Sequence, residues 1–375
     1  MKILSLFDGI SCGRVALERA DIPVERYVAY EIDKYAKAIS AKNYPDIEQC
    51  GDVFDGDFTQ YKGFDLLIGG SPCTYWSIAK NNRETTCEGE GYKLFMQYVR
   101  ALRESGCRWF LYENNYSIHQ NIKDAISDEL GVQPIMINSS LVSAQTRKRC
   151  YWTNIPNIEQ PADRGVLLKD IIESGESFLQ KAYALTTRCS GAIPSDTLKR
   201  HRHTMIAEPV MYQRPRGKNE GGIKEGKAPT VTSHSYEHNN LVVEPIPLNT
   251  TADGKAKCLR AGYGTKDGIR NMVGNNYDRR TCVAIPSDDV ALKQKQIYKV
   301  ESGQIDIKGK LYPIKLADGY YIIRKLLPIE CERLQTLPEG YTEGVSDAQR
   351  IKALGNGWTV EVIAHILKHI KEVKS

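Results

Sequence analysis

The fold of this chain is decided by the stretch Phe64-Asp65-Leu66-Leu67-Ile68-Gly69-Gly70-Ser71-Pro72-Cys73. Its apolar run predicts a buried strand that enters a glycine turn. Because Pro72 fixes the backbone beside Cys73, the thiol is expected at the carboxyl edge of a sheet, where open α/β folds bind their ligands. The alternative is a buried cysteine that packs as a small apolar side chain. The segments on either side favour a functional cysteine.

The composition is that of an ordinary globular protein. The 375 residues suffice for two domains, and 41% are hydrophobic and 26% charged. The net charge of +5 is too small to indicate nucleic acid by itself. None of the ten cysteines is spaced C-x-x-C, so we expect no metal site, and scattered thiols fit a reducing cytosol. The sequence shows neither a basic-plus-apolar leader pattern nor a long apolar run, so we expect no signal peptide and no membrane span.

The N-terminal segment predicts a cofactor site. A predicted strand, Lys2 to Phe7, leads into the turn Asp8 to Gly13 and then a helix. The two glycines of this turn do not form G-x-G-x-x-G, so a nucleotide-like ligand without phosphates is favoured over a dinucleotide. Two further predicted strands end at Glu31-Ile32-Asp33 and Gly51-Asp52-Val53, where carboxylates suit ribose hydroxyls and an adenine amino group. An ordinary β–α turn and helix caps are the alternatives.

Candidate catalytic side chains follow Cys73. The polar stretch from Thr74 to Glu90 predicts a mobile loop, and the next predicted strand ends at Glu113, a candidate acid. Alternation along a later strand places Arg147 and Arg149 on one face, where two guanidinium groups suit a carbonyl or phosphate oxygen. A surface charge cluster is the alternative for the arginines.

The character of the chain changes after about Pro156. From there to about Tyr321 it has short strand-like runs and a degenerate Lys-Ala-x-x-apolar repeat, which begins at Lys181, Lys227 and Lys255 and predicts three similar β units. The segment Arg214 to Lys218 has the composition of a phosphate-contacting loop, and a solvated surface run is the alternative. After residue 321 the sequence predicts a strand, a helix and a final amphipathic helix, whose apolar face is Val360, Ile363, Ala364, Leu367 and Ile370.

Taken together, these segments resemble the cytosine-5 DNA methyltransferase family. The order and spacing match over residues 1–156 and 322–375. The motifs that carry the resemblance are Phe7-Asp8-Gly9 with Gly13, Glu31-Ile32-Asp33, Gly51-Asp52-Val53, Ser71-Pro72-Cys73, Glu113-Asn114, Gln145-x-Arg147-x-Arg149, Arg324 to Pro338 and Gly355-Asn356-Gly357. The Gly-Gly-Ser-Pro-Cys form and Trp358 look more like animal de novo enzymes and phage relatives than the commoner Phe-Pro-Cys form. Asn115 and Gly357 depart from the usual valine and serine, which we expect to affect local packing.

The resemblance implies a fold and a division of labour. The fold is α/β, a Rossmann-like doubly wound sheet of the S-adenosylmethionine-dependent methyltransferase type. Residues 1–156 and 322–375 would form the catalytic domain, with a mostly β target-recognition domain inserted over 157–321. Cys73 would add to carbon 6 of cytosine, Glu113 would act at ring nitrogen 3, and Arg149, with Arg147 near it, would hold the carbonyl oxygen. The residues implied to bind S-adenosylmethionine are Phe7, Asp8, Gly9, Ile10, Ser11, Gly13, Glu31, Ile32, Asp52, Val53, Asn356, Gly357 and Trp358.

The implied partner is double-stranded DNA of a specific sequence, with the target base swung out of the duplex. A separately encoded restriction endonuclease is compatible with the sequence, and the implied location is the cytoplasm of a bacterial or phage-infected cell, at the nucleoid. Three rivals stay open: a tRNA cytosine-5 methyltransferase, a catalytically inactive DNA-binding or regulatory relative, and a nicotinamide dehydrogenase. The large, partly basic insertion disfavours the first, intact Cys73, Glu113 and Arg149 the second, and the absent G-x-G-x-x-G the third.

Overall fold

The computed structural model describes residues 1–72, 75–76, 83–213, 222–225, 240–242 and 297–372. They belong to two compact units. Unit 1 comprises Met1–Glu173, Leu179–Met205 and Lys325–Ser375, and unit 2 comprises Ser174–Phe178 and Ile206–Arg324. Cys73, the segment Arg214 to Lys218 and the second and third expected repeats, at Lys227 and Lys255, lie outside the described residues.

Unit 2 and the expected insertion of residues 157–321 do not have the same limits. They share residues 174–178 and 206–321, whereas residues 157–173 and 179–205 belong to unit 1. Hydrogen bonds explain this assignment. The ammonium of Lys181 donates to the carbonyl oxygens of Ser140, at 2.8 Å, and Ser143, at 3.1 Å. The N–H of Ala182 donates to the carbonyl of Ala144 at 2.7 Å, which joins two short strands, β7 (Gln145–Thr146) and β9 (Ala182–Tyr183).

Unit 1 is built on a seven-stranded sheet with the order β3-β2-β1-β4-β5-β8-β6. The first five strands in this order pair in parallel, and β8 runs antiparallel to both of its neighbours. The strands are β1 (Lys2–Leu6), β2 (Arg26–Tyr30), β3 (Glu48–Cys50), β4 (Leu66–Gly69), β5 (Trp109–Asn115), β6 (Ile135–Asn138) and β8 (Lys148–Thr153). Since β2 and β4 lie on opposite sides of β1, the direction of winding reverses there, which is where a doubly wound sheet opens a ligand crevice. The fold class predicted from the sequence is confirmed.

The strand register brings the candidate residues to one edge. Leu6 of β1 lies opposite Tyr30 of β2 and Gly69 of β4, and Gly69 lies opposite Tyr112 of β5. The residues that follow these four therefore emerge side by side at the carboxyl edge, and they are Phe7, Glu31, Gly70 and Glu113. Segments that are up to about a hundred residues apart in sequence thus meet at one place.

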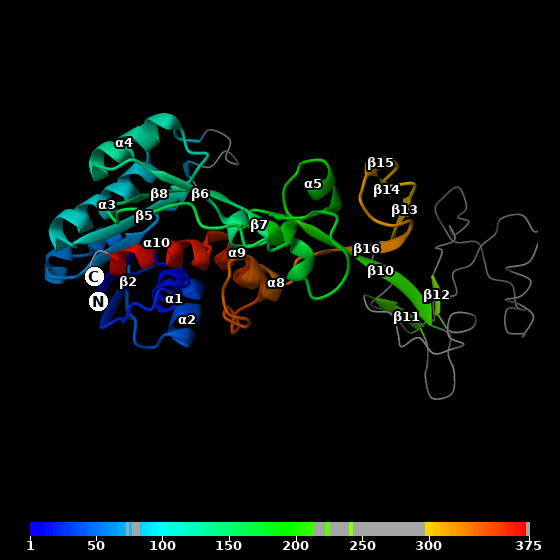
Figure 1. Ribbon diagram of the computed structural model, residues 1–375, viewed down its shortest axis with the longest axis horizontal. Helices are drawn as coiled ribbons and strands as arrows, with labels where there is room; N and C mark the ends of the chain where they lie inside the picture. Colours follow the sequence, from blue (N-terminus) through cyan, green and yellow to red (C-terminus); the bar gives the residue numbers. More distant parts are fainter. Residues whose placement is uncertain (73–74, 77–82, 214–221, 226–239, 243–296, 373–375) are drawn as a thin grey trace, which may run out of the picture. The chain divides into compact units, whose positions relative to one another are not determined.

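Helices cover both faces of this sheet (Figure 1). The helices among the described residues are α1 (Cys12–Arg19), α2 (Lys34–Asn43), α3 (Glu90–Ser105), α4 (Gln120–Leu130), α5 (Pro194–Leu198), α8 (Pro328–Leu334), α9 (Asp347–Asn356) and α10 (Val360–Glu372), and the 3-10 helices there are η1 (Val53–Asp55), η2 (Phe58–Tyr61), η4 (Ser139–Leu141), η5 (Leu168–Asp170) and η6 (Cys189–Gly191). Helices α3 and α4 lie on one side, and α1 and α10 pack against each other on the opposite side. An ion pair of 2.7 Å between Arg19 and Glu361 joins α1 to α10.

Local sequence explains where several helices begin and end. Gly106 and Gly131 follow α3 and α4 with φ of 62° and 68°, the left-handed conformation that ends a helix and suits glycine. Pro328 stands at the first turn of α8, where its missing N–H costs nothing. The predicted apolar face of the last helix is buried, with Val360, Ile363 and Leu367 at 0% exposure. The C-terminal segment therefore completes the core of unit 1, as the sequence predicts.

An aromatic core lies directly beneath the edge of the sheet. The ring of Tyr112 packs against Phe95, Tyr98 and Trp152, with centroids 4.9 to 5.9 Å apart. All four side chains are fully buried. Each such ring contributes about 2–3 kcal/mol by burial alone. Because Tyr112 directly precedes Glu113, this packing holds the backbone of the candidate acid in place.

Unit 2 is an antiparallel sheet. Its described strands are β10 (Met205–Gln213), β11 (Gly222–Glu225), β12 (Asn240–Val242), β13 (Ile297–Glu301), β14 (Gln304–Ile307), β15 (Lys310–Pro313) and β16 (Gly319–Lys325). The order is β11-β10-β16-β13-β14-β15, with β12 also paired to β10. Alternating buried and exposed side chains along β13 and β14 show that one face of this part of the sheet is covered. The expectation of a second, mostly β region is met by these described strands.

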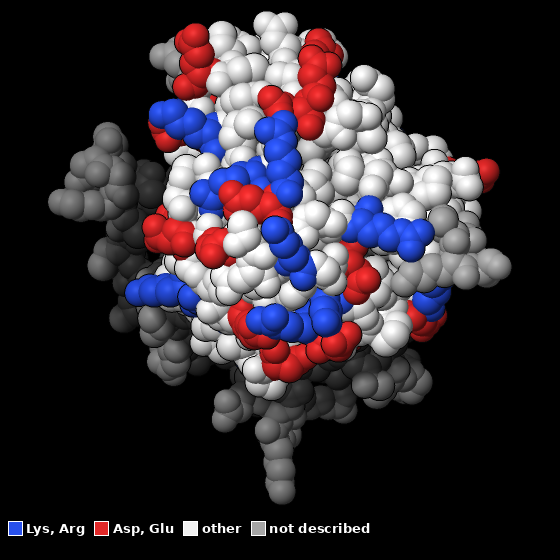
Figure 2. Space-filling model, turned by 90° about the vertical axis from the view of Figure 1, so that its left-hand side faces the viewer, with Lys and Arg blue, Asp and Glu red and all other residues white. Residues whose placement is uncertain are grey.

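Two features of the described residues concern contact with a membrane and with DNA. None of the helices within the described part of the chain is long and apolar enough to cross a bilayer. The face of unit 1 drawn in Figure 2 carries lysines and arginines interspersed with acidic side chains. Such a mixed surface creates no extended positive field, so we do not assign DNA binding to this face.

Candidate active site

A cavity of about 510 Å³ opens at the carboxyl edge of the unit 1 sheet. Its walls come from the turn after β1, the ends of β2 and β3, the turn after β4, the end of β5, the start of β8 and the end of α9. This volume lies in the range of small-molecule and cofactor sites. The strand register described above is what brings these segments together.

The turn after β1 is held by one buried carboxylate. Asp8 accepts hydrogen bonds from the hydroxyls of Ser5, at 2.6 Å, Ser11, at 2.5 Å, and Tyr27, at 2.7 Å. Burial raises the pKa of Asp8, and the three hydroxyl donors oppose that rise. Gly9 follows with a φ of 60°, a conformation in which the missing Cβ avoids strain. Asp8 thus fixes the shape of the turn, and its backbone lines the cavity.

Glu31 connects two strand ends. One carboxylate oxygen accepts the N–H of Gly9 at 2.8 Å, and the other accepts those of Ile32 and Asp33 at 2.8 and 2.7 Å. Burial raises the pKa of Glu31, and these backbone donors act in the opposite direction. The carboxylate therefore spans the gap between β1 and β2 at the cavity wall.

Two apolar side chains stand unusually exposed in this cavity. Ile32 is 74% exposed and Phe54 is 46% exposed, and both line the wall. Asp52, two residues before Phe54, also lines the wall, and its carboxylate accepts the N–H of Phe54 at 3.0 Å. Exposed apolar side chains of this size beside a carboxylate suit a flat heterocycle that carries an amino group.

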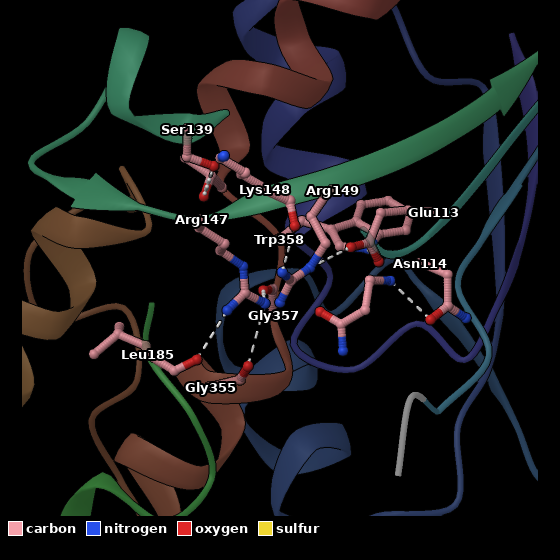
Figure 3. A network of polar contacts seen from close by, with 12 residues as sticks. Glu113, Asn114, Ser139, Arg147, Lys148, Arg149, Leu185, Gly355, Gly357 and Trp358 are labelled. Atoms are coloured by element: carbon pink, nitrogen blue, oxygen red, sulfur yellow. Dashed lines mark hydrogen bonds and ion pairs between the residues drawn. The ribbon is translucent and has the colours of Figure 1, made fainter. Parts of the chain in front are cut away.

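Glu113 meets two donors at the opposite end of the cavity. The Nε of Arg149 lies 2.8 Å from one of its oxygens, and the indole Nε1 of Trp358 donates to the other at 2.9 Å (Figure 3). The register explains the first contact. Glu113 of β5 lies opposite Tyr151 of β8, and Arg149, two residues before Tyr151, therefore lies on the same face and diagonal to Glu113. Glu113 is 8% exposed, and its carboxylate is therefore held in a fixed orientation at the cavity wall.

Arg147 faces different partners from Arg149. Its guanidinium donates to the carbonyl oxygens of Leu185, at 2.9 Å, Gly355, at 3.2 Å, and Gly357, at 2.9 Å. Figure 3 shows the side chain pointing toward these carbonyls, while Arg149 points toward Glu113. Arg147 is 3% exposed, although it also borders the cavity. These contacts suit a residue that holds the C-terminal segment in place better than one that binds a substrate oxygen.

The turn after β4 is anchored to β5. The hydroxyl oxygens of Ser71 and Tyr112 are hydrogen-bonded at 2.6 Å, and the amide of Asn114 donates to the carbonyl of Ser71 at 3.3 Å. Pro72 lines the cavity and directly precedes Cys73 in sequence. The chain is therefore held in place up to the last described residue before the candidate nucleophile.

A second cysteine borders the same cavity. Burial raises the pKa of Cys12 to about 12, with a smaller opposing effect from a hydrogen bond with the backbone of Trp358. At neutral pH Cys12 is thus a thiol, and a thiol is a poor nucleophile. Among the described residues that line the cavity, Cys12 is the only cysteine, so nucleophilic chemistry there requires another residue.

The cavity contains nearly all the residues predicted from sequence. Glu113, Arg147, Arg149 and every predicted cofactor residue except Ser11 and Gly13 line it. Ser11 is fully buried and hydrogen-bonded to Asp8, and Gly13 packs under Ile68, whose Cδ1 would lie 2.4 Å from an added Cβ. Both residues therefore shape the turn from behind.

Sequence reasoning missed other cavity residues. Phe54 directly follows the motif Gly51-Asp52-Val53, so the sequence could have identified it as a cavity residue. No pattern in the sequence pointed to Lys352. The ammonium of Lys352 donates to Asp33 at 2.8 Å, and this bond helps to lower the pKa of Asp33 although burial acts to raise it. Among the described residues no group of three or more His, Cys, Asp or Glu side chains could hold a metal ion.

The residues present fit S-adenosylmethionine. Three carboxylates, Glu31, Asp33 and Asp52, stand at the end of the cavity that contains the glycine turn, and negative charge there disfavours a phosphate. A cofactor that carries a sulfonium and an ammonium suits this wall, and Ile32 and Phe54 offer apolar surface for its adenine.

Comparison with known proteins supports this reading. The model of the family described as "C-5 cytosine-specific DNA methylase" matches residues 1–372. The chain belongs to this family. It is therefore an enzyme that methylates carbon 5 of cytosine in DNA, and the family implies S-adenosylmethionine as the methyl donor.

Two curated relatives and one solved structure illustrate the similarity. The methylase is 32% identical to "Type II methyltransferase M.BanI" of Aneurinibacillus aneurinilyticus, over 99% of this chain and 95% of that protein. It is 26% identical to "Orphan methyltransferase M.SPRI" of Bacillus phage SPR, over 99% and 97%. A crystal structure of Spodoptera frugiperda DNMT2 matches 99% of both chains with a TM-score of 0.55 and 15% identity, which shows the shared fold alone.

Proposed function

We propose that this methylase forms a covalent bond between Cys73 and carbon 6 of a cytosine that has been flipped out of duplex DNA, with Glu113 and Arg149 acting on the same base. The observation that carries the proposal is the position of Glu113. Its carboxylate lies at the cavity wall, next to the turn that leads to Cys73. Gly70 belongs to that turn, and a Cβ added to it would lie only 3.0 Å from Oε2 of Glu113.

The chemistry requires a nucleophile because carbon 5 of cytosine is itself weakly nucleophilic. Addition of the Cys73 thiolate to carbon 6 moves electron density to carbon 5. S-adenosylmethionine, when bound, supplies an electrophilic methyl group. Removal of the carbon 5 proton and expulsion of Cys73 then restore the aromatic ring. Cys12 cannot replace Cys73 in this role because its buried thiol stays protonated.

Glu113 and Arg149 lower the barrier to addition. A proton or hydrogen bond from Glu113 to ring nitrogen 3 makes the ring a better acceptor of the thiolate. Arg149 supports the carboxylate through its Nε, and its guanidinium is a fixed donor for the carbonyl oxygen of the base. Arg147 is a positioning residue in this proposal, because its three carbonyl partners belong to the protein.

The cofactor residues have distinct roles. We assign the ribose hydroxyls to Glu31, the adenine amino group to Asp52, and the faces of the adenine ring to Ile32 and Phe54. The backbone of the Phe7 to Ile10 turn and the segment Asn356 to Trp358 would border the methionine part. All of these residues line one cavity in unit 1.

The region between the two catalytic segments would read the DNA sequence. We propose that unit 2, whose sequence includes the basic segment Arg214 to Lys218, recognises a specific duplex. M.BanI is named a type II methyltransferase and M.SPRI an orphan methyltransferase, so a separately encoded restriction endonuclease is compatible with the similarity but not required by it. The enzyme would act in the cytoplasm of a bacterial or phage-infected cell, at the nucleoid.

Transfer of labelled methyl groups from S-adenosylmethionine tests the proposal. Wild type, Cys73→Ala and Cys107→Ala would be compared on duplex DNA and on bulk tRNA, and the DNA would be mapped for 5-methylcytosine. Cys107 is a matched control because it is buried and does not line the cavity. We expect label in DNA with wild type and Cys107→Ala, and at least a thousandfold less with Cys73→Ala, on the order of losing a catalytic nucleophile.

Other outcomes would overturn parts of the proposal. Label in tRNA alone would contradict the substrate. Undiminished DNA methylation by Cys73→Ala would contradict the nucleophile. Binding of DNA without transfer by the folded wild type would favour an inactive relative.

A further inference from the structure

We propose that Trp358 is a positioning residue for catalysis: its indole N–H orients the carboxylate of Glu113 toward the target base. The sequence motif assigns Trp358 to the cofactor site. Its indole N–H, however, donates to Oε2 of Glu113 at 2.9 Å, whereas the Nε of Arg149 lies 2.8 Å from Oε1. The inference rests on the roles proposed above for Cys73 and Glu113.

Two glycines create the space in which the indole reaches Glu113. A Cβ on Gly13 would lie 3.6 Å from Cζ3 of Trp358, and a Cβ on Gly70 would lie 3.5 Å from its Nε1. The ring is thus enclosed between the helix after β1 and the turn after β4, the two segments that meet where the sheet reverses its winding. A side chain at either glycine would narrow this space.

The backbone that precedes Trp358 is itself held by Arg147, which lies between β7 and β8. Gly357 accepts hydrogen bonds on its carbonyl from Arg147, at 2.9 Å, and Gln335, at 3.2 Å. Arg149, two residues beyond Arg147, contacts the other oxygen of Glu113 (Figure 3). The two arginines therefore act on both oxygens of Glu113. Arg149 contacts one oxygen directly, and Arg147 holds the carbonyl of Gly357, which precedes the donor to the other oxygen, Trp358.

This arrangement has a chemical consequence. A carboxyl group with one donor on each oxygen cannot rotate freely about its last bond, so in the protonated form of Glu113 the O–H stays directed at ring nitrogen 3, which accepts its hydrogen. Loss of the indole donor leaves Arg149 as the remaining described side-chain partner, and the carboxyl group can turn. The effect should appear in the rate of addition, with little effect on cofactor affinity.

Exchange of the hydrogen on carbon 5 measures addition without methyl transfer. The Cys73 thiolate forms the S–C6 bond while nitrogen 3 receives a proton from Glu113, and carbon 5 then takes a proton from water. Loss of the original carbon 5 hydrogen, return of the nitrogen 3 proton and expulsion of the thiolate regenerate cytosine. Duplex DNA that carries tritium on carbon 5 of cytosine therefore releases tritium to water only after addition has taken place.

The test compares Trp358→Phe with Trp152→Phe. Trp152 is a matched control because its indole also donates one hydrogen bond, to Ser127 at 3.0 Å, but in the core and away from the cavity. We expect Trp358→Phe to lower kcat and tritium release by about 10- to 100-fold, the loss of one hydrogen bond to a charged group. The KM for S-adenosylmethionine should change less than about threefold. Trp152→Phe keeps an aromatic ring that can pack against Tyr112, so it should lower stability through the lost hydrogen bond and leave both rates near wild type.

A third variant separates donation from size. Trp358→His keeps a ring N–H but fills less space than phenylalanine, so a donor role predicts faster tritium release than Trp358→Phe and a packing role predicts slower release. The inference is overturned if Trp358→His is no faster than Trp358→Phe, or if Trp358→Phe mainly raises the KM for the cofactor. If wild type neither methylates DNA nor releases tritium, the proposed function itself fails, and the two failures are thereby distinguished.

Discussion

Gly70→Ala tests how closely the turn after β4 must approach the catalytic acid. A Cβ at Gly70 would lie 2.8 Å from the backbone oxygen of Glu113, whereas ordinary contact begins at 3.4 Å, so something must move by about 0.6 Å. The same Cβ would lie 3.0 Å from Oε2 of Glu113. Since backbone is involved, we expect the free energy of unfolding to fall by about 1–3 kcal/mol, as in other overpacked sites. Displacement of the carboxylate should lower kcat by about tenfold or more.

Urea unfolding and steady-state methyl transfer measure these two effects. Gly191→Ala is the control, because Gly191 is exposed and a Cβ there meets no atom within 4 Å. We expect this control to keep the stability and kcat of wild type. If Gly70→Ala were as stable and active as Gly191→Ala, the close approach of Gly70 to Glu113 would be refuted, and with it the site geometry described above.

Three further predictions concern separate features of the site. Arg147→Lys should lower the free energy of unfolding by about 1–3 kcal/mol, because one ammonium lacks the fork of donors that reaches three carbonyls. Arg149→Lys should instead lower kcat more than stability, and thermal unfolding and steady-state kinetics of both variants check this. Ile32→Ser should raise the KM for S-adenosylmethionine by about tenfold without loss of stability, since the side chain is 74% exposed, and an unchanged KM would remove Ile32 from the cofactor site. The pKa of Glu361 lies below its usual 4.5 because the hydrogen bond from Arg164 and nearby positive charge outweigh burial, so its stabilising effect is present above that pH and is lost as the pH falls through the lowered pKa. Glu361→Gln should accordingly be less stable than wild type at about pH 7 in urea unfolding, and the difference should shrink as the pH falls below 4.5 through the lowered pKa; a difference that does not shrink in acid would contradict the ion pairs.

Local patterns predicted much of the fold. The apolar runs predicted as strands, Lys2 to Phe7, Tyr27 to Tyr30, Phe64 to Ile68 and Trp109 to Tyr112, coincide within a few residues with β1, β2, β4 and β5, and the amphipathic segment that begins at Val360 is a buried helix. These predictions succeed because strands and helices follow from the period of apolar residues and from glycine and proline at their ends, which are local properties. The limits of the inserted region were less predictable, because residues 179–205 join unit 1 through non-local contacts such as those of Lys181.

The sequence alone determined which residue types meet at the sheet edge, because motifs after successive strands of a doubly wound sheet must emerge together. Only the tertiary structure decided what each of them contacts. Arg147 and Arg149 are two residues apart and look equivalent in sequence, yet one holds Gly357 and the other holds Glu113. Trp358 reaches Glu113 across 245 positions of the chain, a separation at which no sequence period carries information. The physical reason is that hydrogen bonds depend on distances of about 3 Å, which are set by the packing of the whole unit rather than by neighbours in sequence.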